Sequence, residues 1–96
     1  MPKDTASQVL IKQLTRSGTS VSANVIEAQS ASSKKDYINF YTHALKSANE
    51  SKLWISLIRD TGKIDKEEAD KLLRETIEIA KILGASIITM KGKNRF

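Results

Sequence analysis

The chain has 96 residues, 40% of them hydrophobic and 28% charged, with one proline and four glycines. This length allows one domain, and the balance is typical of a folded helical protein rather than a disordered one. The chain has no cysteine, which excludes disulfides and thiolate metal sites and fits a reducing compartment. The formal net charge is +5, from 16 Lys and Arg against 11 Asp and Glu, which favours anionic partners without naming one.

The first predicted helix covers residues 4–28. Its apolar and small residues alternate spacings of three and four, as one side of a helix requires. They are Ile11, Leu14, Gly18, Val21, Val25 and Ala28. The segment Ser17-Gly18-Thr19-Ser20 contains poor helix formers, but the spacing keeps its phase across it. We therefore predict one continuous helix, in which the small residues allow close approach by a neighbouring helix.

The second predicted helix covers residues 33–61. Ser33 and Asp36 have the spacing of a capping box, with a carboxylate in the first turn. Gly62 can end the helix because glycine adopts the left-handed conformation of a helix cap. The apolar positions again follow spacings of four and three, and they are Tyr37, Tyr41, Ala44, Ala48, Ser51, Ile55 and Ile58.

The third predicted helix covers residues 65–91 and is expected to fray over residues 92–96. Asp65 is the expected N-cap, with Glu68 three residues on, and Ile64 can pack against Ala69 as a hydrophobic staple. The apolar side consists of Ala69, Leu73, Thr76, Ala80, Leu83, Ile87 and Met90. The basic residues Lys91, Lys93 and Arg95 cluster at the C-terminus, where cations also complement a helix dipole.

Three helices with short connections predict an all-α, antiparallel up-down bundle that forms a single domain over residues 1–96. The apolar stripes are broad, so a fourth helix from another chain, or a shared oligomer interface, would use them better than three helices alone. The N-terminus has no apolar signal region, and no apolar run approaches the roughly 20 residues of a membrane span. We therefore expect a soluble, cytoplasmic protein.

The sequence shows no constellation of catalytic residues. His43 is the only histidine, and without cysteines or a second histidine it cannot build a convincing metal site. The carboxylates at the start of the third helix are explained by capping and by the helix dipole, and no glycine-rich phosphate loop is present. We therefore expect no enzyme, no cofactor and no metal.

Several polar residues lie close to the apolar sides of the first two helices. One interpretation is an interhelical network that fixes the register of the helices. Its candidates are Arg16, Asn24, Glu27, Asn49 and Glu50. The alternative is a polar surface groove flanked by cations that contact phosphates, independently of nucleotide sequence. The candidate cations are Lys12, Arg16, Lys34, Lys35, Lys46 and Lys52.

The segment from Gln13 to Ala28, which includes Arg16-Ser17-Gly18-Thr19-Ser20, resembles the signature of a family of small four-helix-bundle proteins. This family is related to the intervening-sequence protein of large-subunit ribosomal RNA and includes the accessory protein of diversity-generating retroelements. The resemblance continues through residues 33–37 and 44–54 and into the last helix. It implies an up-down bundle that assembles into a pentamer, with a basic surface for nucleic acid and, in the retroelement branch, for a reverse transcriptase.

About a dozen residues precede Arg16, where the family has a full helix, so we expect the first family helix to be missing or truncated. Either the start of the gene lies further upstream, or this member is a three-helix version that covers its exposed face by self-association. The leading hypothesis is a homo-oligomer that binds RNA or DNA. The alternative is a structural or adaptor bundle that docks a partner protein, such as a reverse transcriptase, through an exposed apolar groove.

Overall fold

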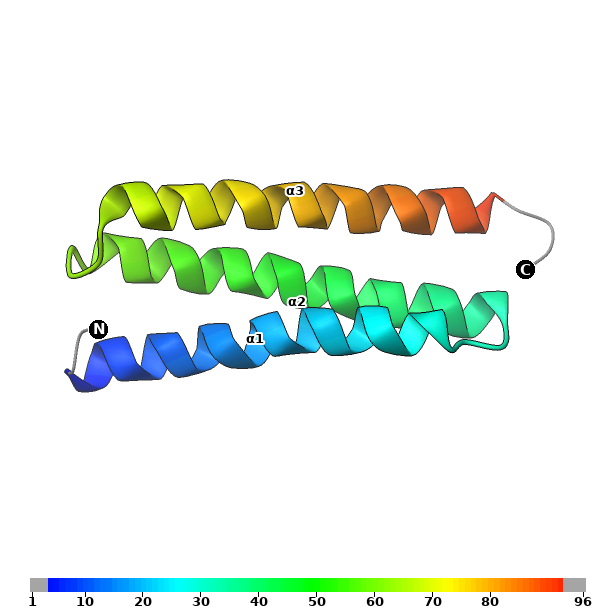
Figure 1. Cartoon of the computed structure of the whole chain (residues 1–96), viewed down its shortest axis with the longest axis horizontal. Helices are drawn as coiled ribbons and strands as arrows, with labels where there is room; N and C mark the ends of the chain where they lie inside the picture. The colour runs from blue at the N-terminus through cyan, green and yellow to red at the C-terminus, as the bar shows by residue number, and fades with distance from the viewer. Residues whose placement is uncertain (1–3, 93–96) are drawn as a thin grey trace.

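The computed structural model describes residues 4–92, which form three antiparallel α-helices connected by two short loops (Figure 1). Helix α1 spans Thr5–Gln29, α2 spans Lys34–Asp60 and α3 spans Lys66–Lys91. Each boundary differs from the predicted one by no more than one residue. The all-α, up-down fold predicted from the sequence is confirmed, and the fraying and the basic residues predicted for 93–96 lie outside the described residues.

The ends of the helices follow the capping residues in the sequence. The carboxylate of Asp4 accepts a hydrogen bond from the backbone N–H of Ser7, at 2.9 Å. The hydroxyl of Ser33 accepts one from the N–H of Asp36, at 3.1 Å, and Asp65 caps α3 in the same way. These bonds satisfy N–H groups that the first turn of a helix leaves without partners.

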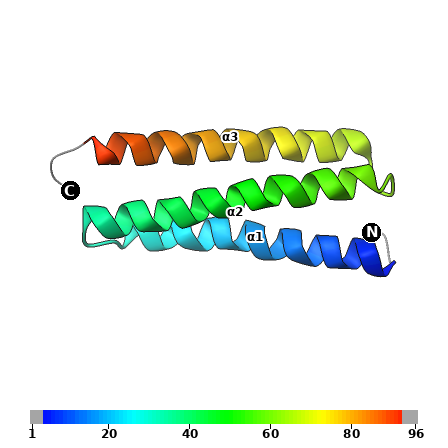
Figure 2. The same ribbon diagram turned by 180° about the vertical axis from the view of Figure 1, so that it is seen from behind.

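The three helices form an open layer with α2 in the middle. Both α1 and α3 pack against α2, but no Cα atom of α1 lies within 8 Å of one in α3. Figures 1 and 2, which view the layer from opposite sides, show α2 between its two neighbours. The Cα extents of 50 × 20 × 14 Å describe an elongated layer. The centre of the fold is therefore α2, and the two outer helices are attached to it separately.

The core is built from small side chains. Ala44 and Ala48 of α2 are buried against Ala80 and Leu83 of α3. From α1, Val21 and Val25 are half-buried against this cluster, and Tyr41 and Leu45 of α2 add to it. Small residues let helix axes approach closely, so this short chain can bury a continuous interior with few large side chains.

The small residue of α1 that is buried against α2 differs by one position from the predicted one. The sequence predicted Gly18 on the contact side, but Gly18 is exposed, and a Cβ atom added there would meet no atom within 4 Å. Ser17 is the buried residue, with 0% of its surface exposed. The reason is that one residue turns the helix by about 100°, so the chain places Gly18 beside the contact rather than in it.

Ion pairs tie together the end of the layer that contains the loop between α2 and α3. Lys63 in that loop pairs with the N-cap residue Asp4, at 2.6 Å. Arg59 near the end of α2 pairs with Asp70 of α3, at 3.1 Å. The hydrogen bond from Lys63 holds the pKa of Asp4 well below the ordinary value of 3.8, and Asp70 raises the pKa of Arg59. Gly62 has a φ of +72° in this loop, a conformation that favours glycine.

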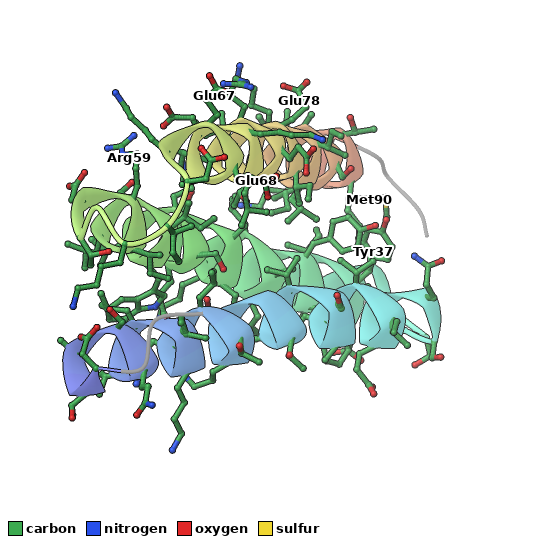
Figure 3. The ribbon with its side chains drawn as sticks, turned by 60° about the vertical axis from the view of Figure 1, so that its left-hand side comes forward. Tyr37, Arg59, Glu67, Glu68, Glu78 and Met90 are labelled. Carbon is green, nitrogen blue, oxygen red and sulfur yellow. The ribbon has the colours of Figure 1, made fainter. Side chains whose placement is uncertain are left out.

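At the opposite end of the layer, Tyr37 and Tyr41 of α2 stack with their ring centroids 4.6 Å apart. Hydrogen bonding to Tyr41, together with burial, raises the pKa of Tyr37 to about 12. Tyr37 lies beside Met90 near the end of α3 (Figure 3). Tyr37 therefore packs between α2 and α3 and stays neutral at physiological pH.

Substitutions at the neighbouring residues 17 and 18 should have opposite effects on stability. Ser17→Leu places a large side chain where α1 and α2 touch, and overpacking of this kind costs about 1–3 kcal/mol. Gly18→Ala should stabilise the fold by up to about 1 kcal/mol, because alanine favours the helix and its Cβ meets no neighbour. Urea unfolding of both variants measures the two effects. Destabilisation by Gly18→Ala would contradict this assignment of the contact residue.

Asp4→Asn should destabilise the protein at neutral pH while leaving the cap in place, since asparagine caps helices as well as aspartate does. The lowered pKa of Asp4 means that its charge stabilises the fold above pH 3.8, and this contribution is lost as the pH falls toward the folded-state value. The difference in melting temperature between wild type and variant should therefore be largest near pH 7 and shrink below pH 4. A difference independent of pH would contradict the ion pair with Lys63.

Candidate nucleic-acid interface and the polar seam between α1 and α2

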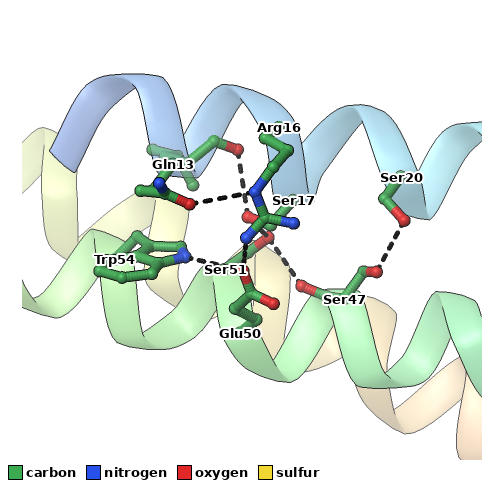
Figure 4. A network of polar contacts seen from close by, with 9 residues as sticks. Gln13, Arg16, Ser17, Ser20, Ser47, Glu50, Ser51 and Trp54 are labelled. Carbon is green, nitrogen blue, oxygen red and sulfur yellow. Dashed lines mark hydrogen bonds and ion pairs between the residues drawn. The ribbon is translucent and has the colours of Figure 1, made fainter. Parts of the chain in front are cut away.

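Two pairs of serines join α1 to α2 in the middle of the layer. The hydroxyl oxygens of Ser17 and Ser51 lie 2.7 Å apart, and those of Ser20 and Ser47 lie 2.8 Å apart (Figure 4). Ser17 and Ser20 are three residues apart on α1, and Ser47 and Ser51 are four apart on α2, so each pair shares one side of its helix. We call these four serines the serine seam.

Both hydroxyl hydrogens of the buried pair, Ser17 and Ser51, have an acceptor. Ser17 can also donate to the carbonyl oxygen of Leu14, at 3.2 Å, and Ser51 to that of Ser47, at 2.9 Å. Because a hydroxyl has one hydrogen, one serine donates to the other while the second donates to its own backbone. Buried polar groups favour arrangements that give them partners, so this pair fixes the register of α1 on α2.

A partly exposed ion pair borders the serine seam. The guanidinium of Arg16 pairs with the carboxylate of Glu50, and the Nε of Arg16 donates to Gln13, at 3.0 Å. The indole N–H of Trp54 donates to the same Glu50 oxygen, at 3.1 Å (Figure 4). Exposed pairs of this kind contribute only about 0–1 kcal/mol. The pair therefore aligns the two helices more than it stabilises them, and the charge of Arg16 already has a carboxylate beside it.

The structure separates the five residues predicted for the interhelical network. Arg16 and Glu50 pair directly. Asn24 donates to the backbone oxygen and the hydroxyl of Ser20, at 2.9 and 3.2 Å, and so reaches the serine seam. Glu27 and Asn49 are exposed and take no part in the seam's hydrogen bonds.

Helix geometry explains why Glu27 and Asn49 lie outside the interhelical hydrogen bonds. Asn49 follows the buried Ala48, but one residue turns its side chain by about 100° toward solvent. None of the four seam serines was in the predicted network, and Ser51 was predicted among the apolar positions of the second helix. Their signal was present in the sequence as serines at spacings of three and four on two adjacent helices.

The six residues predicted to contact phosphate spread along α1 and α2 and do not gather in one cleft. Lys12, Lys35 and Lys46 are exposed, whereas Lys34 and Lys52 are half-buried. Lys35 and Lys46 are eleven residues apart, close to three full turns, so both lie on the side of α2 that faces solvent. From residue 34 to residue 52, α2 rises about 27 Å at 1.5 Å per residue. The arrangement is a strip of cations rather than a pocket.

The positive charge is unevenly divided among the helices. Helices α1 and α2 together carry seven basic against four acidic residues, whereas α3 carries five of each. The first turn of α3 contains the carboxylates Glu67 and Glu68 (Figure 3). A polyanion would therefore meet a favourable field over α1 and α2 and a neutral surface over α3.

The structure also bears on a metal site and on a membrane-spanning helix. His43 is exposed on α2, and within residues 4–92 no three His, Asp or Glu side chains come together in a way that could hold a metal ion. No helix in the described part of the chain is both long and apolar enough to cross a membrane.

Comparisons with known proteins identify the family. The model of the 23S rRNA-intervening sequence protein family matches residues 1–85. None of the curated proteins matches the chain. Among solved structures, the chain is similar to a crystal structure from Bacteroides thetaiotaomicron, described as a protein with unknown function from the S23 ribosomal protein family. The two share 42% sequence identity over 82% of this chain and 73% of that one, with a TM-score of 0.79. The resemblance found in the sequence is confirmed, and the chain belongs to the 23S rRNA-intervening sequence protein family.

Proposed function

We propose that this chain is a non-enzymatic, cytoplasmic protein that binds nucleic acid along the outer sides of α1 and α2. The observation that carries the proposal is the division of charge, seven basic against four acidic residues on these two helices and five of each on α3. The name of the family refers to an intervening sequence of 23S rRNA, so structured RNA is the first ligand to test.

The geometry suits contact with phosphates better than the reading of bases. Lys35 and Lys46 lie on the exposed side of α2, and their flexible ammonium groups bind phosphate as point charges. Contacts of this kind release counterions and do not depend on nucleotide sequence. Lys35, Lys46 and Lys12 supply these contacts, and Arg16 contributes less because Glu50 already pairs with it.

The proposal predicts RNA binding that weakens steeply with salt. The double variant Lys35→Glu/Lys46→Glu should lower affinity for a short structured RNA at least tenfold near 50 mM salt. It should also reduce the slope of log affinity against log salt by about 2, because each of the two lysines neutralises about one phosphate. Fluorescence anisotropy at several salt concentrations measures both values.

Lys81→Glu is the matched control, because Lys81 is an exposed lysine on the charge-balanced helix α3. It should lower affinity much less than the double variant does. Circular dichroism should show equal helix content in all variants. Binding that ignores salt, or an equal decrease in affinity on substituting Lys81, would count against the proposal.

A second candidate function is that of an adaptor that docks a partner protein. It is favoured by the apolar groove that the open layer leaves between α1 and α3. A reverse transcriptase as that partner, and a pentamer as the assembly, stay predictions from the family resemblance. A chain that fails to bind RNA at low salt would favour the adaptor over the nucleic-acid-binding protein.

A further inference from the structure

The exposed side of α2 carries a row of lysines and neutral polar side chains. Its members follow spacings of four and three along the sequence, so they share one side of the helix. We call this row the polar ridge, and its residues, all exposed, are Lys35, Asn39, Thr42, Lys46 and Asn49. The ridge is roughly 21 Å long at 1.5 Å per residue. It faces away from the apolar groove, whose lining on α2 includes the buried Ala48 and Ile55.

Thr42, in the middle of the polar ridge, has a hydroxyl that is able to accept but not to donate. Its hydrogen is donated to the backbone oxygen of Ile38, at 2.7 Å. Because a hydroxyl has only one hydrogen, Thr42 can still accept a hydrogen bond from a ligand. A phosphodiester at neutral pH has no hydrogen to donate, whereas a sugar hydroxyl has one. Thr42 therefore suits a ligand hydroxyl rather than a phosphate.

The other neutral residues of the polar ridge have the same preference. Within residues 4–92, the side chains of Asn39 and Asn49 form no hydrogen bond, so both amides are free for a ligand. An amide donates and accepts, as a hydroxyl does, while the ammonium groups of Lys35 and Lys46 only donate and suit phosphates. The ridge thus combines partners for phosphates with partners for hydroxyls, and an RNA backbone carries both groups.

We propose that the polar ridge binds the minor groove of double-stranded RNA, an inference that rests on the proposed nucleic-acid binding and names its ligand. The two lysines contact phosphates, and Asn39, Thr42 and Asn49 contact 2′-hydroxyls. The minor groove of an RNA helix is wide and shallow and displays its 2′-hydroxyls. The exposed side of one helix can therefore contact it without entering a deep groove.

Single-stranded RNA fits the polar ridge less well than a duplex. Proteins hold single strands by stacking successive bases on aromatic side chains. The Tyr, Phe and Trp side chains of residues 4–92 are all half-buried. His43 beside the ridge is exposed, but one ring cannot stack several bases in succession. The ridge therefore lacks the platform that a single strand needs.

Double-stranded DNA also fits the polar ridge less well, because it has no 2′-hydroxyl for Thr42 to accept from. The major groove of DNA is about 12 Å wide and admits one helix. Helix α2 has a neighbour on each side, and the three helices together extend over 20 Å between Cα atoms (Figure 1). The layer is thus too wide to enter that groove.

The first test compares three ligands of one short sequence, prepared as an RNA duplex, a DNA duplex and a single RNA strand. Fluorescence anisotropy with the wild-type chain should give an affinity for the RNA duplex that is roughly fivefold or more above the other two, as a few additional hydrogen bonds would produce. Equal affinity for the DNA duplex or for the single strand would overturn the inference.

Thr42→Val tests the contact with 2′-hydroxyls, because valine keeps the shape of threonine and removes the acceptor. It should lower affinity for the RNA duplex about threefold to tenfold, the size of one hydrogen bond. It should leave affinity for the DNA duplex unchanged, and also the dependence on salt, because no charge is altered. Thr19→Val is the matched control, since Thr19 is an exposed threonine that lines the apolar groove on the other face. Equal helix content by circular dichroism shows that both variants fold.

The lysine variant separates failure of this inference from failure of the proposed function. If Thr42→Val keeps the full preference for the RNA duplex while Lys35→Glu/Lys46→Glu still lowers affinity, the chain binds nucleic acid but the assignment of the polar ridge is overturned. If Lys35→Glu/Lys46→Glu binds all three ligands as the wild type does, both proposals are overturned. Loss of the RNA preference in Thr42→Val but not in Thr19→Val supports the ridge.

Discussion

The close contact between α1 and α2 at Ser17 and Ser51 is the constraint on which the other features of this fold depend. Both side chains are buried, and their hydroxyls meet at 2.7 Å. A larger residue at either position would separate the two helices. Together with the alanines of α2, these serines let one central helix hold a neighbour on each side. The protein can therefore form an ordered layer without contact between the backbones of α1 and α3.

This arrangement gives the two faces of the layer different chemistry. On one face, the Arg16–Glu50 pair borders a surface of exposed polar and basic side chains. On the other, the apolar walls of α1 and α3 flank the buried isoleucines of α2. Each face then suits a different partner, a polyanion on the first and an apolar protein surface on the second.

Most of the fold could be predicted from the sequence because helix signals are local. Asp4, Ser33 and Asp65 begin the helices, and spacings of three and four carry the helical phase through Gly18. The same spacing could not distinguish residues that pack on a neighbouring helix from residues that line an open groove. Gly18 and Ile11 were predicted to pack on a neighbouring helix, but they line the open groove. The reason is that the apolar stripe of α1 is wider than its contact with α2.

The polar residues were harder to predict because their partners lie far away in the sequence. Ser17 and Ser51 are 34 residues apart, as are Arg16 and Glu50. Their pairing requires the register of two helices, which composition and spacing alone do not give. Glu27 and Asn49 looked equally suitable, but the helical turn directs them to solvent. The net positive charge was visible in the sequence. Which sides of α1 and α2 present that charge to solvent depends on how the three helices pack, and this requires the structure.

The role of the serine seam can be measured by a double-mutant cycle, in which Ser17→Ala, Ser51→Ala and the double variant are compared by urea unfolding. We expect a coupling free energy of about 1 kcal/mol, because each single substitution removes the same interhelical hydrogen bond. Purely additive effects would contradict this role, since the two hydroxyls would then contribute independently and could not set the register of α1 on α2.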